Sequence, residues 1–258
     1  MLKSQMEIVS DKLVKAFLQN KIISPIPLKF VKNIAKAKKL RELCESKINI
    51  PIIGFKAGGT SIPVLKKLRE KEPFYAAIFK NNFLQSNQKV KINSYTLGIE
   101  LEVCFLIKRE FFLKKEKINL SNINKIISHM APCIEIVGYR QKKKGLKYLG
   151  DICSDFGANV KFLIGKKIKY KKLNFDNLKT KIYNTKSQQC EKGNTNTVYK
   201  NPLNSLKFIL NKIKKNKINL RKSFYVFTGS TVGVVPIKKK GLFIGTIDNL
   251  GSVKALIV

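Results

Sequence analysis

Thr96-Leu-Gly-Ile-Glu-Leu-Glu-Val-Cys-Phe-Leu-Ile107 is an apolar run that carries two acidic side chains, Glu100 and Glu102. Its content of Thr, Ile, Val and Phe predicts a strand over 97–108. Residues two apart on a strand point to the same face, about 6–7 Å from each other. The two glutamates should therefore project together. Carboxylates that close repel each other in a partly buried site, and one of them protonates unless a cation lies between them.

A third acid, Glu135, lies in a similar setting, Ala131-Pro-Cys-Ile-Glu-Ile-Val137. Acids in apolar runs stand out here, because the chain has only 16 acidic residues against 52 basic ones. Three carboxylates offer the oxygen ligands that Mg²⁺ or Mn²⁺ prefers, with positions left open for water and substrate. The alternative is an edge strand whose polar face pairs with lysines. The second apolar run favours the metal site.

The net charge of +36 suggests a nucleic-acid partner. Only five of the 52 basic residues are Arg, however, whereas proteins that contact bases and phosphates tend to use Arg. The lysines are spread over most segments, among many Asn and Ile, and no zinc-finger, RNA-binding or helix-turn-helix motif is present. We therefore expect no specific nucleic-acid partner. Salt-sensitive nucleic-acid binding remains the alternative from another class of function.

The chain shows no membrane or disulfide signature. No apolar run approaches the roughly 20 residues of a membrane span, and the N-terminus lacks the apolar core of a signal peptide. We expect a cytoplasmic protein. The five cysteines, odd in number and without a Cys-x-x-Cys pair, are interpreted as reduced core residues. A catalytic cysteine is disfavoured because His129 is the single histidine.

The pattern along the chain predicts an α+β fold, with an α-rich N-terminal region over 1–72 and a β-rich catalytic domain over 73–258. Helices are expected over 4–20, 30–48, 64–70 (capped by Thr60 or Ser61), 121–130 and 202–216. The other expected strands are 51–57, 73–79, 132–138, 160–164, 166–171, 178–185, 224–227 and 252–258. The polar stretch 186–200 is interpreted as a hairpin tip or a mobile loop.

Six short motifs follow one another in the sequence: Gly54-Phe-Lys-Ala-Gly-Gly-Thr-Ser61, Glu100-Leu-Glu102, Ile134-Glu-Ile-Val137, Asn201-Pro-Leu-Asn-Ser-Leu206, Thr228-Gly-Ser230 and Leu250-Gly-Ser-Val253. Together they resemble the 2-keto-4-pentenoate hydratase and 2-oxo-acid decarboxylase family of the fumarylacetoacetate hydrolase superfamily. The resemblance covers roughly residues 50–258. It implies a mixed β-roll catalytic domain, a homo-oligomer, and Mg²⁺ or Mn²⁺ bound by Glu100, Glu102 and Glu135.

The resemblance also implies an activity. Members of this family act on small anionic 2-oxo or 2-hydroxy-dienoic acids from aromatic catabolism, as hydratases or decarboxylases. The metal would chelate the carboxylate and the 2-oxo oxygen of the substrate and stabilise an enolate. Lys56 stands where the family has its active-site lysine. We expect it to balance the charge of the acids and, with a pKa lowered by burial, to transfer protons. The alternative is a surface lysine.

Five further residues are assigned to the substrate. Ser61 and Ser230 are expected to donate hydrogen bonds to the substrate carboxylate, assisted by the Gly-rich turns, including Thr228 and Gly229. Arg140 completes the set. It lies in Gly138-Tyr139-Arg140, where the family commonly has Asp-Ser-Arg.

The chain departs from the family at the proton-transfer acid, because Asn81 stands where an Asp is usual. Asn cannot act as a general base near neutral pH, although it can position a water molecule. Three interpretations follow. The first is a metal-dependent lyase, either hydratase or decarboxylase. The second is a hydrolase of a C–C bond, for which His129 is poorly placed to activate water. The third is a divergent, non-catalytic homologue.

Overall fold

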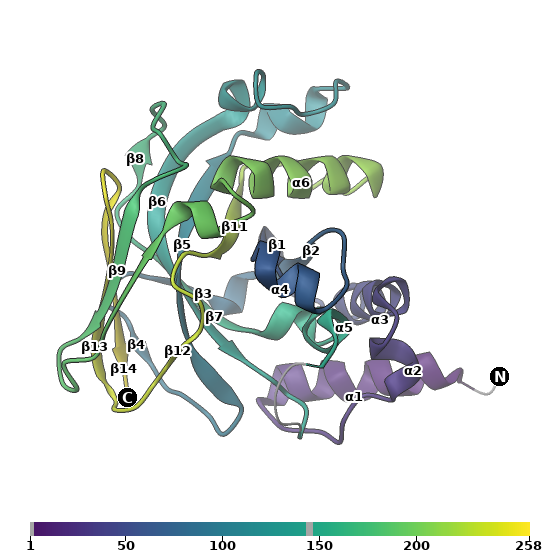
Figure 1. Ribbon diagram of the computed structural model, residues 1–258. Helices are drawn as coiled ribbons and strands as arrows, with labels where there is room; N and C mark the ends of the chain where they lie inside the picture. Colours follow the sequence, from purple (N-terminus) through teal and green to yellow (C-terminus); the bar gives the residue numbers. More distant parts are fainter. Residues whose placement is uncertain (1–2, 143–146) are drawn as a thin grey trace.

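The fold consists of two β-sheets and a group of helices, seen in a computed structural model that describes residues 3–142 and 147–258. The larger, curled sheet lies between helices on one side and a smaller sheet on the other (Figure 1). This arrangement confirms the predicted α+β architecture, a helical N-terminal region followed by a mixed β-roll. None of the helices in these residues has both the length and the apolar character of a membrane span.

The helices are short, and most of them gather beside the larger sheet. They are α1 (Gln5–Gln19), α2 (Leu28–Val31), α3 (Ile34–Ser46), α4 (Ile62–Lys67), α5 (Leu149–Ser154) and α6 (Pro202–Lys215). Ser4 and Glu7 form a capping box at the start of α1. The helix α6 follows the Asn201 cap and buries Leu206, Ile209 and Ile213 at helical spacing against the sheet.

The larger sheet has nine strands, most of them in one hydrogen-bonded path. In order these are β2 (Phe74–Phe79), β1 (Ile52–Gly58), β11 (Phe224–Ser230), β5 (Thr96–Ile107), β6 (Ile127–Gly138), β7 (Asn159–Ile164) and β3 (Phe83–Gln85), with β12 (Val235–Pro236) on β5 and β8 (Ile168–Lys169) on β6. The smaller sheet runs β10 (Cys190–Asn194), β9 (Lys179–Asn184), β13 (Gly241–Ile247), β14 (Gly251–Ile257) and β4 (Lys89–Val90).

Both faces of β5 are covered, which explains its nearly continuous apolar sequence. Leu101 and Val103 belong to the main core, and Leu101 packs so closely on β13 that a Cβ on Gly245 would lie 2.5 Å from its Cδ1. The opposite face carries Glu100, Glu102 and then the buried Cys104. The alternation of a strand therefore places both glutamates on one inner face.

Three local expectations are wrong in whole or in part. A helix over 121–130 is replaced by a short 3-10 turn, Ile123–Ile126, followed by β6, because Met130 and its neighbours pair with β5 and β8. The stretch 186–200 includes the tip of a hairpin, as expected, but also the strand β10, which pairs with β9. Ser61 occupies the N-cap position of α4, but its side chain makes no capping hydrogen bond.

The structure forms no disulfide among the five cysteines, all of which lie in the described residues. Four of them are buried and free, and Cys190 is exposed.

The division into 1–72 and 73–258 stays a prediction. The strand β1 precedes that boundary in the sequence, yet it is hydrogen-bonded between β2 and β11 of the larger sheet.

The glycine at the start of β1 provides a test of this packing. A Cβ on Gly54 would lie 2.4 Å from the carbonyl oxygen of Tyr225 on β11. We expect Gly54→Ala to lower the free energy of unfolding by about 1–3 kcal/mol, because the β1–β11 pair must separate. Urea unfolding measures the change, with Leu113→Ala as a control, since Leu113 is 78% exposed. Equal stability of the two variants would contradict this account.

Candidate metal centre and active site

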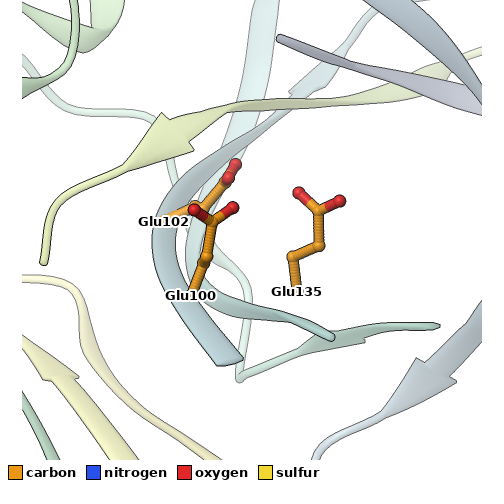
Figure 2. A group of neighbouring side chains, drawn as sticks. All are labelled: Glu100, Glu102 and Glu135. Atoms are coloured by element: carbon orange, nitrogen blue, oxygen red, sulfur yellow. The ribbon is translucent and has the colours of Figure 1, made fainter. Parts of the chain in front are cut away.

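Two neighbouring strands bring the three glutamates together. In the antiparallel β5–β6 pair, Glu100 lies directly opposite Glu135, and Glu102 lies opposite Cys133. One oxygen atom from each of the three carboxylates lies within 4.8 Å of the other two. Figure 2 shows Glu100 and Glu102 side by side on β5, with Glu135 facing them. The spacing of two along β5 and the strand register together produce this cluster.

Lys56 reaches the same point from β1. Its Nζ lies 3.0 Å from Glu135 Oε1 and donates a hydrogen bond of 3.0 Å to the carbonyl oxygen of Gly157. The lysine is 4% exposed, so it is not a surface residue. The cluster therefore sets one positively charged side chain, that of Lys56, against three carboxylates.

An irregularity in β11 supplies a backbone donor. The register between β11 and β5 shifts between Phe227 and Ser230, and the N–H of Gly229 in this stretch donates to Glu102 Oε2 at 2.8 Å. Gly229 has a φ of 113°, and a Cβ there would lie 2.2 Å from Thr60 Oγ1. Only glycine accommodates both constraints.

The cluster raises the pKa of all three acids. Burial raises the pKa of Glu100 and, well above its usual range, that of Glu135, although Lys56 opposes both shifts. Burial and the nearby charge of Glu100 raise the pKa of Glu102 to about 8. Without a metal ion, Glu102 therefore favours its protonated form at neutral pH.

The pKa of Lys56 shifts in the direction opposite to the expected one. Burial lowers it, but the charges of Glu135, Glu100 and Glu102 together raise it above its ordinary value. The expectation that Lys56 has a lowered pKa is therefore wrong for the site without a metal ion. Lys56 is a protonated hydrogen-bond donor at neutral pH.

Unsatisfied oxygen atoms show that the residues fit a divalent cation. Glu102 Oε1 and Glu135 Oε2 are buried and accept no hydrogen bond in the described part of the chain, and Glu135 Oε1 has only the ion pair with Lys56. Such orphaned acceptors are costly unless another group satisfies them. Glu100, Glu102 and Glu135 could hold a hard cation such as Mg²⁺, which takes oxygen ligands and keeps open positions.

Above the carboxylates lies a cavity of about 510 Å³, into which Glu100 and Lys56 open. Two Gly-rich turns form part of its wall, over 58–61 and 229–233. A second cavity, of about 550 Å³, is lined by residues of α3, β2 and α6 and includes none of the three glutamates. Of these two cavities, the first is therefore the one that the carboxylate cluster and Lys56 border.

The structure brings some of the predicted substrate residues to this cavity. Ser61, Gly229 and Ser230 line it. Thr228 does not. It is fully buried, and its Oγ1 donates to the carbonyl oxygen of Val103.

Three other residues lie outside the cavity lining. Arg140 is 2% exposed and pairs with Asp155. Asn81 lies on the 3-10 turn Lys80–Asn82, where its carbonyl oxygen accepts a hydrogen bond from Lys161. His129 lies on β6, about 20 Å along the strand from Glu135.

Sequence reasoning missed several residues of the wall. Tyr139 lines the cavity, and burial raises its pKa to about 12, so it retains its hydroxyl proton. Its position four residues after Glu135 was an available signal, because alternate residues of a strand share a face. Lys192 of β10 and the half-exposed Leu97 and Val234 also line the cavity, but they had no such signal.

Comparison with known proteins identifies enzymes of related sequence. No family model matches the chain. A 2-keto-4-pentenoate hydratase from Burkholderia vietnamiensis (strain G4 / LMG 22486) is 26% identical over 209 residues, which cover 79% of this chain and 77% of the relative.

Solved structures share the fold. A 4-oxalocrotonate decarboxylase from Pseudomonas putida G7, complexed with magnesium and adipate, superposes with a TM-score of 0.87, 17% identity, and coverage of 100% of this chain and 99% of that one. A fumarylacetoacetate hydrolase family protein from Yersinia pestis CO92 superposes with a TM-score of 0.58, 14% identity, and coverage of 82% and 95%.

The carboxylate cluster predicts metal binding that depends on each acid. We expect Glu102→Gln and Glu135→Gln to weaken Mn²⁺ binding at least roughly 100-fold, since even outer partners of metal ligands matter 10- to 100-fold. Isothermal titration calorimetry measures the affinity. Glu110→Gln, at an exposed acid on the 3-10 turn Arg109–Leu113, is the control and should bind normally. Normal Mn²⁺ affinity in Glu102→Gln would contradict the assignment of the three glutamates as metal ligands.

The raised pKa values predict how pH affects the site. A carboxyl whose folded-state pKa is raised stabilises the protein at low pH, and that stability is lost as pH rises from about 4.5 through about 8 for Glu102. Metal binding displaces the same protons, so the Mg²⁺ affinity should rise with pH by up to roughly tenfold per unit for each proton displaced. Thermal unfolding with and without Mg²⁺ between pH 6 and 8 measures this. A Mg²⁺-induced Tm increase independent of pH would contradict it.

Proposed function

We propose that the chain is a member of the fumarylacetoacetate hydrolase superfamily and a metal-dependent lyase that acts on 2-hydroxy-dienoic or other 2-oxo acids, as a hydratase. One observation carries the proposal: three clustered carboxylates, of which Glu102 and Glu135 are fully buried, meet Lys56 at the base of a cavity walled by Gly-rich turns. The substrate is a small anion such as 2-keto-4-pentenoate.

The chain's own residues bind and orient this substrate. The Gly-rich turns over 58–61 and 229–233 bring backbone and the Ser61 and Ser230 side chains to the cavity, where N–H and O–H groups suit a carboxylate. Mg²⁺ or Mn²⁺ held by the three glutamates would act as a Lewis acid toward the 2-oxo carboxylate. The apolar wall, including Val232 and Val234, keeps water from the remote end of the substrate.

Lys56 supplies positive charge where the reaction develops negative charge. The enolate of a 2-oxo acid carries its charge on the former 2-oxo oxygen, and a substrate bound over the carboxylate cluster would bring that oxygen near the Lys56 ammonium. Protonated Lys56 donates a hydrogen bond there and is suited to deliver a proton rather than remove one.

A second reaction, decarboxylation of a vinylogous 2-oxo acid, has support of its own. Glu100 is the one acid that lines the cavity among the described residues, and Asn81 lies elsewhere. Hydration requires a group that activates water, whereas decarboxylation releases CO₂, leaves an enolate and then needs one proton. The small number of acid/base side chains in the cavity lining therefore supports decarboxylation as the alternative reaction.

The remaining interpretations have less support. A fumarylacetoacetate-type hydrolase needs an activated water, and His129 lies too far along β6 to activate one. A non-catalytic homologue would retain the metal site without turnover. Assembly as a homo-oligomer and a cytoplasmic location remain part of the proposal.

Turnover assays test the proposal. With Mn²⁺, the protein should consume 2-keto-4-pentenoate or 4-oxalocrotonate, and Lys56→Met should lower kcat by roughly 100-fold or more while retaining metal binding. Loss of ultraviolet absorbance measures turnover, and CO₂ release separates decarboxylation from hydration. The control is Lys66→Met, at an exposed lysine of α4. Bound Mn²⁺ without consumption of either substrate would establish the non-catalytic homologue instead.

A further inference from the structure

The backbone next to Lys56 adopts an unusual conformation. Phe156, Gly157 and Ala158 have successive φ values of 49°, 72° and 61°. Residues with a side chain adopt this left-handed region rarely and persist there only when surrounding contacts hold them. The turn lies between α5 and β7, and its Gly157 and Ala158 line the substrate cavity.

A single arginine holds both ends of this turn. The Arg140 backbone N–H donates to Asp155 Oδ2 at 2.6 Å, and its Nη1 donates to Asp155 Oδ1 at 3.1 Å. Its Nη2 donates to the carbonyl oxygen of Asn159, at the other end of the turn. The guanidinium thus contacts the chain on both sides of the left-handed residues. Arginine suits this role because its donors are held in one rigid plane.

The arginine is fixed in turn by aromatic side chains. Its guanidinium carbon lies 4.9 Å from the ring centroid of Phe17, 5.4 Å from that of Tyr95 and 5.7 Å from that of Phe156. Arg140 is 2% exposed and Asp155 is fully buried. The pair is therefore enclosed in the protein, and neither of its residues lines the substrate cavity.

The turn directs one group at the active site, the carbonyl oxygen of Gly157. It accepts a hydrogen bond of 3.0 Å from Lys56 Nζ, which also lies 3.0 Å from Glu135 Oε1. The fit is close, because a Cβ on Gly157 would lie 3.2 Å from Lys56 Cδ and 2.9 Å from Ala76 Cβ. The turn therefore packs directly against the Lys56 side chain and against β2.

We propose that Arg140 and Asp155 are positioning residues for Lys56, which act by holding the left-handed turn so that the Gly157 carbonyl fixes the Lys56 ammonium beside Glu135. This assigns Arg140 to the lysine rather than to the substrate. A lysine side chain has four rotatable bonds and no rigid fork, so it needs an external partner to hold one orientation. We call the Arg140–Asp155 pair the clamp. Its role in turnover rests on the proposed function, whereas its effect on the position of Lys56 does not.

Kinetics of clamp variants provide the first test. In Asp155→Ala, kcat should fall roughly 10- to 100-fold, because small misplacement of a reacting group costs that much. KM and Mn²⁺ affinity should stay within about twofold, because the clamp contacts neither substrate nor carboxylates. In the Lys56→Met background, Asp155→Ala should cause no further loss of kcat, since residues that act as one unit are not additive. Multiplying losses in the double variant would overturn the proposal.

Labelling of Lys56 provides a second test that needs no turnover. In the native protein, acetic anhydride should modify Lys56 slowly, and in Asp155→Ala the rate should rise roughly fivefold or more as the turn opens. Mass spectrometry measures the rate, with the exposed Lys192 of the same cavity as the internal reference. An unchanged Lys56 rate would overturn the clamp even if the protein had no activity on any 2-oxo acid.

A matched control and a milder variant complete the design. Glu45→Ala removes one acidic partner of another buried arginine, Arg41, whose Nε lies 3.4 Å from Glu45, so it should alter stability without changing kcat or Lys56 labelling. If Asp155→Ala does not fold, Asp155→Asn keeps one side-chain oxygen for Arg140 and is used in both assays. Equal effects of Glu45→Ala and the Asp155 variant on Lys56 would reduce the clamp to general destabilisation.

Discussion

The mutual repulsion of three carboxylates in the protein interior is the constraint on which the rest of the site depends. Glu100, Glu102 and Glu135 are held together by adjacent strands whose register leaves them no way to separate. Charges of like sign so close and so poorly hydrated must be protonated or compensated. Lys56 and the Gly229 N–H compensate part of this charge, and the unsatisfied oxygen atoms leave room for a divalent cation.

Regular and irregular backbone have different tasks around this cluster. The regular strands β5 and β6 carry the charged ligands, because a ladder of hydrogen bonds fixes their spacing. Irregular backbone supplies single polar groups: the shifted register of β11 frees the Gly229 N–H for Glu102, and the left-handed turn directs the Gly157 carbonyl at Lys56. Neither group would be available within a regular ladder, since its neighbouring strand would already be bonded to it.

The sequence predicted the parts of the site that depend on local spacing. Two acids at an interval of two in a strand must share a face, and this prediction for β5 is confirmed. Prediction from the sequence was wrong where contacts between distant segments decide the structure or the pKa. The helix expected at 121–130 lost to strand pairing with β5 and β8, and the pKa of Lys56 responds to three acids from other strands. Asn81 has the position of the family acid in the sequence but lies outside the cavity lining.

By itself, the sequence determined the types of group in the site and the fold class: oxygen ligands in apolar strands, a lysine between a strand and a Gly-rich turn, and an α+β fold. Only the tertiary structure decided how these groups meet. Glu135 faces Glu100 because of the β5–β6 register, and Arg140 lies beside Asp155 because β6 ends against the turn after α5. Side-chain type and spacing are properties of a segment, whereas register, burial and the choice of partner arise from contacts between segments far apart in the chain.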